Sequence, residues 1–259
     1  VRRVVCSKRV KGVQENGVAA CVKHYALNNQ EKYRGEINVN VDDRALHEIY
    51  LPAFKAAVEQ GHAWALMGSY NQYKNQHCCH NEYLLNNILK RDWKFDGVVI
   101  SDWGGVHDTK QAVENGLDME FGTWTNGLNW SASNAYDNYY LATPYLEMIQ
   151  KGEFTEKELN DKVRRILRLE FRTNMNRNRP FGSFASEEHA EAGRKIIQEG
   201  AVLLKNDKNV LPLNTQSIKH LLVVGENAIK RLTIGGGSSS LKVREEISPL
   251  EGIIARAAK

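Results

Sequence analysis

Apolar residues recur along the first half of this chain in two alternating patterns. Four short stretches are rich in apolar residues and carry polar residues at or near their ends, at 18–26, 63–70, 97–101 and 116–122, and Val98–Ile100 is a continuous β-branched run. Such runs are typical of strands buried on both faces of a parallel sheet. The stretches 42–61, 82–90 and 109–114 have helical spacing instead, with a kink expected at Pro52. Strands that alternate with helices predict a parallel α/β sheet with right-handed crossovers.

The pattern changes after Trp130. Helices are predicted at about 136–151, 155–172 and 186–199, and the second begins with the capping box of Thr155 and Glu158. The polar stretch 174–180 predicts a linker. Continuous apolar runs at 201–205 and 221–225 then predict two buried strands, which would begin a second α/β domain.

Composition narrows the class of protein. A chain of 259 residues with 42% hydrophobic residues, 25% charged residues and a net charge of +4 is typical of a globular protein. Basic and acidic residues are interspersed, which argues against nucleic acid as a partner. No apolar run reaches the 18 or so residues of a membrane span. Four cysteines do not indicate a disulfide scaffold.

The segment His77-Cys78-Cys79-His80 has the residue types of a zinc site. Structural zinc sites separate their paired ligands by two or more residues and recruit a second pair elsewhere, which this sequence lacks. We therefore expect no metal, and interpret the segment as a polar loop before a helix.

Residues with chemical potential follow each predicted strand. The first strand ends in Lys23 and His24, the second in Tyr70, and the third in Asp102 and Trp103. The exits of parallel strands share one edge of a sheet, so these side chains should converge there. A carboxylate beside cationic and aromatic groups suits a polyhydroxylated ligand. An equally open alternative is that Asp102 caps a helix near Val106 and Trp103 belongs to the core.

A retaining glycosidase needs a second carboxyl group about 5–5.5 Å from the nucleophile. The spacing makes Glu120, after the fourth predicted strand, a candidate for this partner. Alternation along a strand sends only part of the segment into the pocket. We therefore favour Asp118 and Glu120 as acceptors for backbone amides.

Six stretches together carry a resemblance to a known family: 22–34, 67–71, 96–104, 116–120, 200–206 and 235–239. In this order they resemble glycoside hydrolase family 3, most closely its β-glucosidases. The family's N-acetylglucosaminidase branch has a Pro-Gly-His loop after Lys-His. Here residues 25–29 read Tyr-Ala-Leu-Asn-Asn, so the resemblance points away from that branch.

The resemblance implies the C-terminal half of a TIM-type (β/α)8 barrel followed by the start of an α/β sandwich domain. The expected divisions are a partial barrel over 1–130, a helical connection and linker over 131–185, and the beginning of the sandwich over 186–259. The family's early barrel strands would precede Val1. Its acid/base glutamate would follow Lys259.

The resemblance also implies site residues. Asp102 would be the catalytic nucleophile of a retaining, two-step mechanism without metal or cofactor. Lys23 and His24 would bind hydroxyl groups of the sugar. Arg34, Met67 and Tyr70 would line the same subsite, and Trp103 would flank the nucleophile on the aglycone side.

The function expected from these features is exo-acting hydrolysis of terminal β-D-glucosyl residues from a glucoside or oligosaccharide. A β-xylosidase is an alternative, because a hydroxymethyl group gives a pocket only weak discrimination. A second alternative is an inactive sugar-binding or structural portion, because half a barrel exposes a sheet edge. Further partners would be a second copy or the remaining parts of its own chain. The resemblance favours a secreted or periplasmic location and leaves a cytoplasmic one open.

Overall fold

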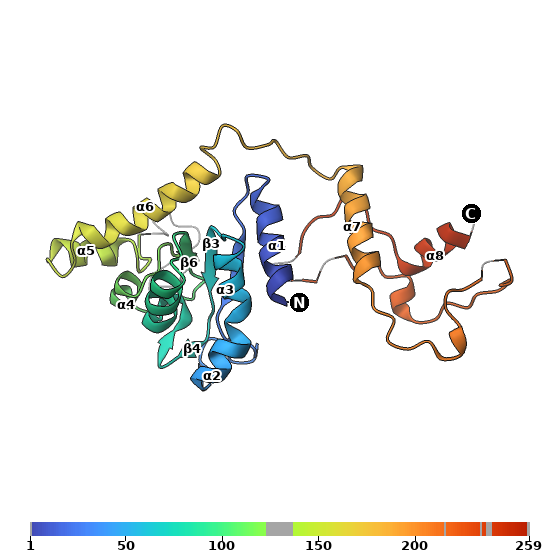
Figure 1. The fold of residues 1–259 in the computed structure, drawn as a ribbon, viewed down its shortest axis with the longest axis horizontal. Coiled ribbons are helices and arrows are strands. Elements are labelled where there is room, and N and C mark those ends of the chain that lie inside the picture. The colour runs from blue at the N-terminus through green and yellow to red at the C-terminus, as the bar shows by residue number, and fades with distance from the viewer. Residues whose placement is uncertain (1, 123–136, 215, 234, 237–239, 258–259) are drawn as a thin grey trace. The chain divides into compact units, whose positions relative to one another are not determined.

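The computed structural model of the protein describes residues 2–122, 137–214, 216–233, 235–236 and 240–257. The chain divides into two compact units, Val1–Phe181 and Gly182–Lys259. The first unit holds a parallel sheet with its helices, and the second holds helices joined by extended chain and short turns (Figure 1). The predicted division of the chain at 131–185, as a helical connection between barrel and sandwich, stays a prediction.

The elements of the first unit are, in chain order, α1 (Arg2–Gln14), β1 (Cys21–Tyr25), β2 (Asn38–Val39), α2 (Asp43–Ala45), the π-helical turn η1 (Leu46–Tyr50), α3 (Pro52–Glu59), β3 (Ala65–Gly68), β4 (Gln72–Tyr73), β5 (Gln76–His77), the 3₁₀ turn η2 (Cys78–His80), the π-helix η3 (Tyr83–Asp92), β6 (Val98–Ile100), α4 (Thr109–Glu114), α5 (Thr143–Gln150) and α6 (Glu156–Arg172). Those of the second unit are α7 (Glu187–Gly200), the 3₁₀ turns η4 (Asp207–Asn209) and η5 (Glu226–Ala228), and α8 (Pro249–Ala257).

Three parallel strands in the order β1–β3–β6 form the centre of the first unit. β3 and β6 pair in register from Ala65 opposite Val98 to Met67 opposite Ile100. Nearly all of their residues are buried, as continuous apolar runs require. The predicted parallel sheet is thus confirmed. The fourth predicted strand, 116–122, contributes a single bridge within the described residues, from Met119 to Ile100.

The register between β1 and β3 is irregular. Val22 lies opposite Leu66 and Tyr25 opposite Gly68, so three steps along β1 match two along β3. An extra residue on one strand re-aims the side chains beside it. The residues at this irregularity are Lys23 and His24.

The helical patterns form the predicted helices, with two differences. The helix expected over 42–61 is broken into α2, η1 and α3, and Pro52 is the first residue of α3. Proline fits a first turn because it has no N–H to place there. The helix expected over 136–151 begins only at Thr143, and residue 136 lies outside the described residues. α6 does begin at the capping box of Thr155 and Glu158.

Two features of the first unit were not predicted. α1 packs on α3, and the side chain of Gln14 joins its end to the start of β3 by donating to the His62 carbonyl (2.8 Å) and accepting from the Trp64 amide (2.9 Å). β2, β4 and β5 form a small second sheet beyond the exit of β3. Their two-residue strands are too short for a periodic pattern.

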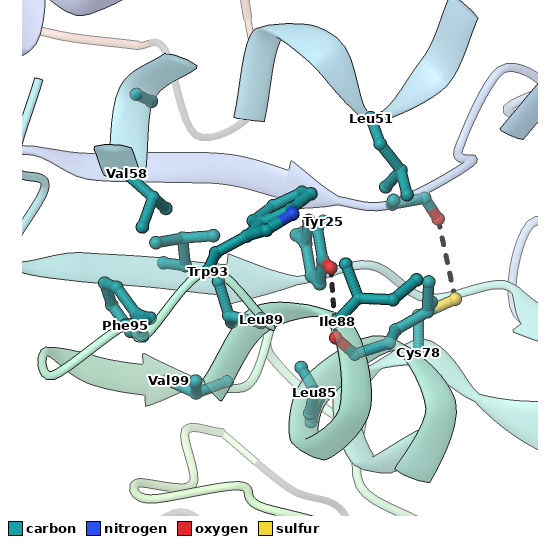
Figure 2. Packing of buried hydrophobic residues seen from close by; sticks show 14 of the residues in the cluster. Tyr25, Leu51, Val58, Cys78, Leu85, Ile88, Leu89, Trp93, Phe95 and Val99 are labelled. Carbon is teal, nitrogen blue, oxygen red and sulfur yellow. Dashed lines mark hydrogen bonds between the residues drawn. The ribbon is translucent and has the colours of Figure 1, made fainter. Parts of the chain in front are cut away.

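The core lies between the sheet, α3 and η3 (Figure 2). Tyr25, at the end of β1, is fully buried there, with its ring edge-on to Phe54 and Trp93 at centroid distances of 5.1 and 5.9 Å. A buried phenol needs a hydrogen-bond partner. The hydroxyl donates to the Leu84 carbonyl, at 3.0 Å, and a dashed line at Tyr25 marks this bond in Figure 2. This bond joins the exit of β1 to η3.

A buried ionic group fixes the segment after α4. The Asp118 side chain is fully buried, accepts from the Val99 amide at 2.8 Å, and pairs with Lys90 at 2.7 Å. Lys162 of α6 donates to the carbonyls of Ala112, Val113 and Leu117. Burial lowers the pKa of Lys162 to about 8, and the Asp118 charge opposes that shift.

The second unit corrects two predictions. The stretches 201–205 and 221–225 were expected to be buried strands, yet the structure describes no strand there. Their apolar side chains are exposed, Leu204 by 92% and Leu222 by 85%. A strand of a parallel sheet exists only when neighbouring strands satisfy its backbone groups. No paired neighbour is present among the described residues of this unit. Helix α7 was predicted, and the structure confirms it.

Replacing Asp118 by alanine should strongly destabilise the first unit, because Lys90 would remain buried without its partner. We expect a loss of roughly 3–5 kcal/mol in the free energy of unfolding. The matched control is Asp161→Ala, which removes an exposed partner of Arg165 and should cost less than about 1 kcal/mol. Urea unfolding followed by circular dichroism measures both. Equal losses for the two variants would contradict this interpretation.

Candidate active site

Asp102 lies two residues beyond β6 and is 8% exposed. Its Oδ1 accepts from the amide of Trp103 at 2.8 Å, and its carbonyl accepts from the amide of Gly105 at 3.0 Å. These bonds hold a tight turn that presents the carboxylate at the strand exit. The alternative that Asp102 caps a helix is wrong, because α4 begins at Thr109 and is capped by Asp108.

Two side chains from neighbouring strands reach this carboxylate. His24 Nε2 lies 3.4 Å from Asp102 Oδ2, and the Tyr70 hydroxyl lies close enough to the carboxylate to donate a hydrogen bond to it. Burial lowers the pKa of His24, and the nearby Asp102 charge opposes this shift. Burial and the bond to Asp102 raise the pKa of Tyr70 to about 12. Both groups are therefore uncharged donors at neutral pH.

Arg34 joins this cluster through Tyr70. Its guanidinium lies over the phenol ring at 4.3 Å from the centroid. Glu31 accepts from Arg34 at 2.7 Å and from the Asn28 amide group at 3.2 Å, so the loop after β1 holds the guanidinium in place. Cation–π contacts at this distance favour a fixed orientation of both groups.

The remaining predicted site residues lie around these four. Lys23 is exposed beside His24 and close enough to lower its pKa. Met67 is buried in β3, opposite Ile100. Trp103 is 52% exposed, which rules out the core position considered above, and its ring lies 5.2 Å from that of Phe121.

An apolar cavity of about 610 Å³ adjoins Trp103. It extends between the segment 118–122 and the helices α5 and α6, and Phe121, Tyr139, Leu141 and Val163 are among the residues that line it. The exposed indole therefore borders an apolar space, while the backbone amide of Trp103 contacts the Asp102 carboxylate.

Asp118 and Glu120 hold structure together, as we favoured. Asp118 is sequestered with Lys90, and Glu120 accepts from the backbone amides of Tyr140 and Leu141 at 3.2 and 2.7 Å. Both oxygens of Glu120 thus accept from backbone amides, which is the structural role and not the role of the second carboxyl group.

The segment His77–His80 forms the end of β5 and the turn η2. All four cysteines of the chain are free thiols. Within the described parts of the chain, no group of three or more histidine, cysteine or acidic side chains is arranged to hold a metal ion. Instead, His77, His80 and His107 form a cluster of rings, with centroid distances of 3.8 Å between His77 and His107 and 5.6 Å between His77 and His80.

His80 is buried as a neutral ring whose tautomer its partners define. Its Nδ1 lies 3.2 Å from the Gln111 side-chain oxygen, which can only accept, and its Nε2 accepts from the His107 amide at 3.3 Å. Burial, followed by the neighbouring rings of His77 and His107, lowers the pKa of His80 to about 4.

Sequence reasoning missed this cluster and the role of Cys79. The Cys79 sulfur sits where side chains at Gly68 and Gly105 would lie, 2.9 and 2.7 Å from their ideal Cβ positions. Because glycine has no Cβ, Gly68 and Gly105 leave room for the sulfur of Cys79. Cys79 lies between these two glycines in the chain, and no spacing in the sequence signals this contact.

The fold and the site define the class: a β/α protein with a carboxylate, aromatic rings and uncharged donors at the exits of parallel strands. Residues 2–169 match the model of the glycosyl hydrolase family 3 N-terminal domain, and residues 201–259 match that of its C-terminal domain. The chain belongs to glycosyl hydrolase family 3.

Individual relatives agree with this family assignment. The chain is 53% identical to β-glucosidase BoGH3A of Bacteroides ovatus, over 97% of this chain and 34% of that protein. It is similar to the crystal structure of the Kluyveromyces marxianus β-glucosidase in complex with glucose, with a TM-score of 0.80, 34% identity, and coverage of 98% of this chain and 30% of that one. It is also similar to the structure of β-glucosidase 3B of Thermotoga neapolitana in complex with glucose, with a TM-score of 0.78 and 31% identity. This match covers 96% of this chain and 34% of that one. The chain thus spans about a third of the length of these relatives.

None of the described helices is both long and apolar enough to cross a membrane. The fold expected from the resemblance, part of a TIM barrel followed by part of an α/β sandwich, agrees with these solved relatives.

The free energy of unfolding should decrease as the pH is lowered, because His80 resists protonation in the folded state. The unfolded chain takes up this proton near the ordinary pKa of 6.5, and the folded chain only near 4. The stabilisation is therefore complete above pH 6.5 and is lost progressively as the pH falls toward 4. At pH 5 the loss from this group is about 2 kcal/mol.

The variant His80→Gln cannot protonate and should lack this component. Urea unfolding of both proteins at pH 7 and pH 5 measures the difference. The same pH dependence in both proteins would show that His80 does not contribute as described.

Proposed function

We propose that the full-length protein is a retaining exo-β-glucosidase and that Asp102 is its nucleophile. The observation that carries this proposal is the position of Asp102 at the exit of β6, in contact with His24 and Tyr70. The β-glucosidases among its relatives support the choice of sugar.

In this mechanism the Asp102 carboxylate attacks the anomeric carbon and forms a glycosyl ester. The bond to the leaving oxygen breaks, and an acid donates a proton to that oxygen. Water then attacks the anomeric carbon from the side opposite Asp102, and the bond from this carbon to the Asp102 oxygen breaks. The residue that donated the first proton now acts as a base and takes the proton of the water. Two inversions at one carbon return the β configuration.

The groups around Asp102 suit the sugar. Lys23 and His24 can bind its hydroxyl groups, and Arg34, Met67 and Tyr70 form the adjacent wall. Tyr70 can donate to the carboxylate, and such a bond would keep one carboxylate oxygen oriented for attack. The proposed acid/base is a glutamate of the second domain beyond Lys259. We also propose three domain divisions: the partial barrel over 1–130, the helical connection and linker over 131–185, and the beginning of the sandwich domain over 186–259.

Replacing Asp102 by alanine should lower kcat for an aryl β-glucoside by roughly three orders of magnitude or more, because no covalent intermediate can form. The matched control is Asp108→Asn, which removes a nearby negative charge and keeps a side-chain oxygen for the cap of α4. We expect this control to retain most of the activity.

Azide should restore turnover of Asp102→Ala and yield the α-glucosyl azide, because azide replaces the carboxylate and inverts the anomeric centre once. Proton NMR identifies this product. An Asp102→Ala variant that keeps most of its activity would refute the assigned nucleophile. A panel of aryl glycosides that favoured the xyloside would correct the sugar.

Trp103 should affect the aglycone more than the sugar, since its exposed indole borders the apolar cavity. We expect Trp103→Ala to raise KM for an aryl glucoside by roughly tenfold, the value of one lost aromatic contact. Trp103→Phe, which keeps a ring against Phe121, is the matched control and should lose less. The KM values for aryl and methyl β-glucoside test this, and equal increases for both substrates would contradict it.

A further inference from the structure

The segment His77–His80, which the sequence offered as a metal motif, contacts the exits of all three central strands. The Cys78 thiol donates to the carbonyl of Ala26, after β1, at 3.5 Å. The Cys79 thiol donates to the carbonyl of Ser69, after β3, at 3.5 Å. The Cys79 sulfur also lies against the turn after β6, 2.7 Å from the ideal Cβ position of Gly105. This segment therefore lies beneath the turns that carry the proposed site.

His77 makes the contact nearest to the proposed chemistry. Its Nδ1 lies 3.1 Å from the backbone carbonyl of Tyr70. A carbonyl oxygen only accepts, so Nδ1 carries a proton and donates it. This bond holds the main chain of Tyr70, whose hydroxyl lies close enough to the Asp102 carboxylate to donate a hydrogen bond to it.

The other face of His77 contacts the loop that follows Asp102. Its ring stacks on that of His107, with centroids 3.8 Å apart and planes 23° apart. His107 is fixed in turn by the bond from its amide to His80. His77 thus joins the loop that carries Tyr70 to the loop that carries Asp102.

We propose that His77 is a positioning residue, which holds Tyr70 so that its hydroxyl stays on the Asp102 carboxylate. The expected effect of His77 on kcat rests on the proposed function, whereas its anchoring of Tyr70 does not. His77 acts through Tyr70 and is not itself assigned a contact with sugar. The hydrogen bond from Nδ1, rather than the stacked ring, carries the effect.

Three variants of the full-length protein separate these contributions. His77→Asn keeps an amide donor near the position of Nδ1 and loses the ring. His77→Phe keeps the ring and loses the donor, and His77→Ala loses both. Active-site titration with an aryl 2-deoxy-2-fluoroglucoside counts competent sites, so kcat is expressed per competent site and misfolded protein does not lower it.

We expect His77→Ala and His77→Phe to lower kcat per site by roughly ten- to a hundredfold, the range caused by small misplacements of reacting groups, with a smaller change in KM. His77→Asn should retain most of the activity. A His77→Asn variant as impaired as His77→Ala, or a His77→Phe variant that is unimpaired, would overturn the proposal.

A double-mutant cycle with Tyr70→Phe tests whether His77 acts through the hydroxyl. If it does, adding His77→Ala to Tyr70→Phe should lower kcat no further. Independent losses, with the two fold-changes multiplying, would overturn the proposal even if His77→Ala alone is impaired.

Amide hydrogen exchange over residues 69–72 gives a readout that needs no activity. Exchange should be faster in His77→Ala than in the unmodified protein, and unchanged in His77→Asn. An unmodified protein without turnover on any aryl glycoside would refute the proposed function. Exchange would still decide whether His77 holds Tyr70, and unchanged exchange in His77→Ala would refute that anchoring.

Discussion

The pairing of β3 with β6 determines where the groups of the candidate site stand. Met67 lies opposite Ile100, so both chains leave the sheet at the same level. Tyr70 follows one strand and Asp102 the other, and they emerge as neighbours. A shift of one residue in a parallel pair would move one of them along the strand by about 3.3 Å and turn its side chain to the other face. The bond between Tyr70 and Asp102 therefore depends on this register.

The strands, their order along the chain and the residues at their exits could be predicted from the sequence because they depend on local pattern. A continuous run such as Val98–Ile100 identifies its own strand and the polar residue after it. The contacts that support the strand exits from behind could not be predicted in the same way. His77 and Cys79 contact residues of strand exits that are remote in sequence, and no spacing encodes those contacts. The histidine and cysteine residue types suggested a metal motif, whereas their bonds to backbone carbonyls give them a different role.

The same local pattern was wrong in the second unit, and the contrast has a physical cause. Residues 65–68 and 98–100 pair with each other and are covered by the core that includes η3. Residues 201–205 are as apolar, yet Leu204 remains exposed and no strand forms there. An apolar run specifies a strand only together with a neighbour that takes its backbone bonds. The local sequence shows whether a run is apolar, but it does not show whether a neighbouring strand is present.

Two aspartates of one unit show how environment separates structural from chemical roles. Asp118 is fully enclosed, and its oxygens are taken by the Lys90 ammonium and the Val99 amide. Asp102 is reached by groups that carry no charge at neutral pH, the His24 ring and the Tyr70 hydroxyl, and its side chain keeps some exposure. A permanent cation in contact would stabilise the carboxylate more than the ester that forms during attack, and would slow that step. Uncharged donors orient the oxygen with less of this penalty. The proposed nucleophile is therefore the aspartate whose partners can be exchanged for substrate, and the enclosed one holds the segment beside it in place.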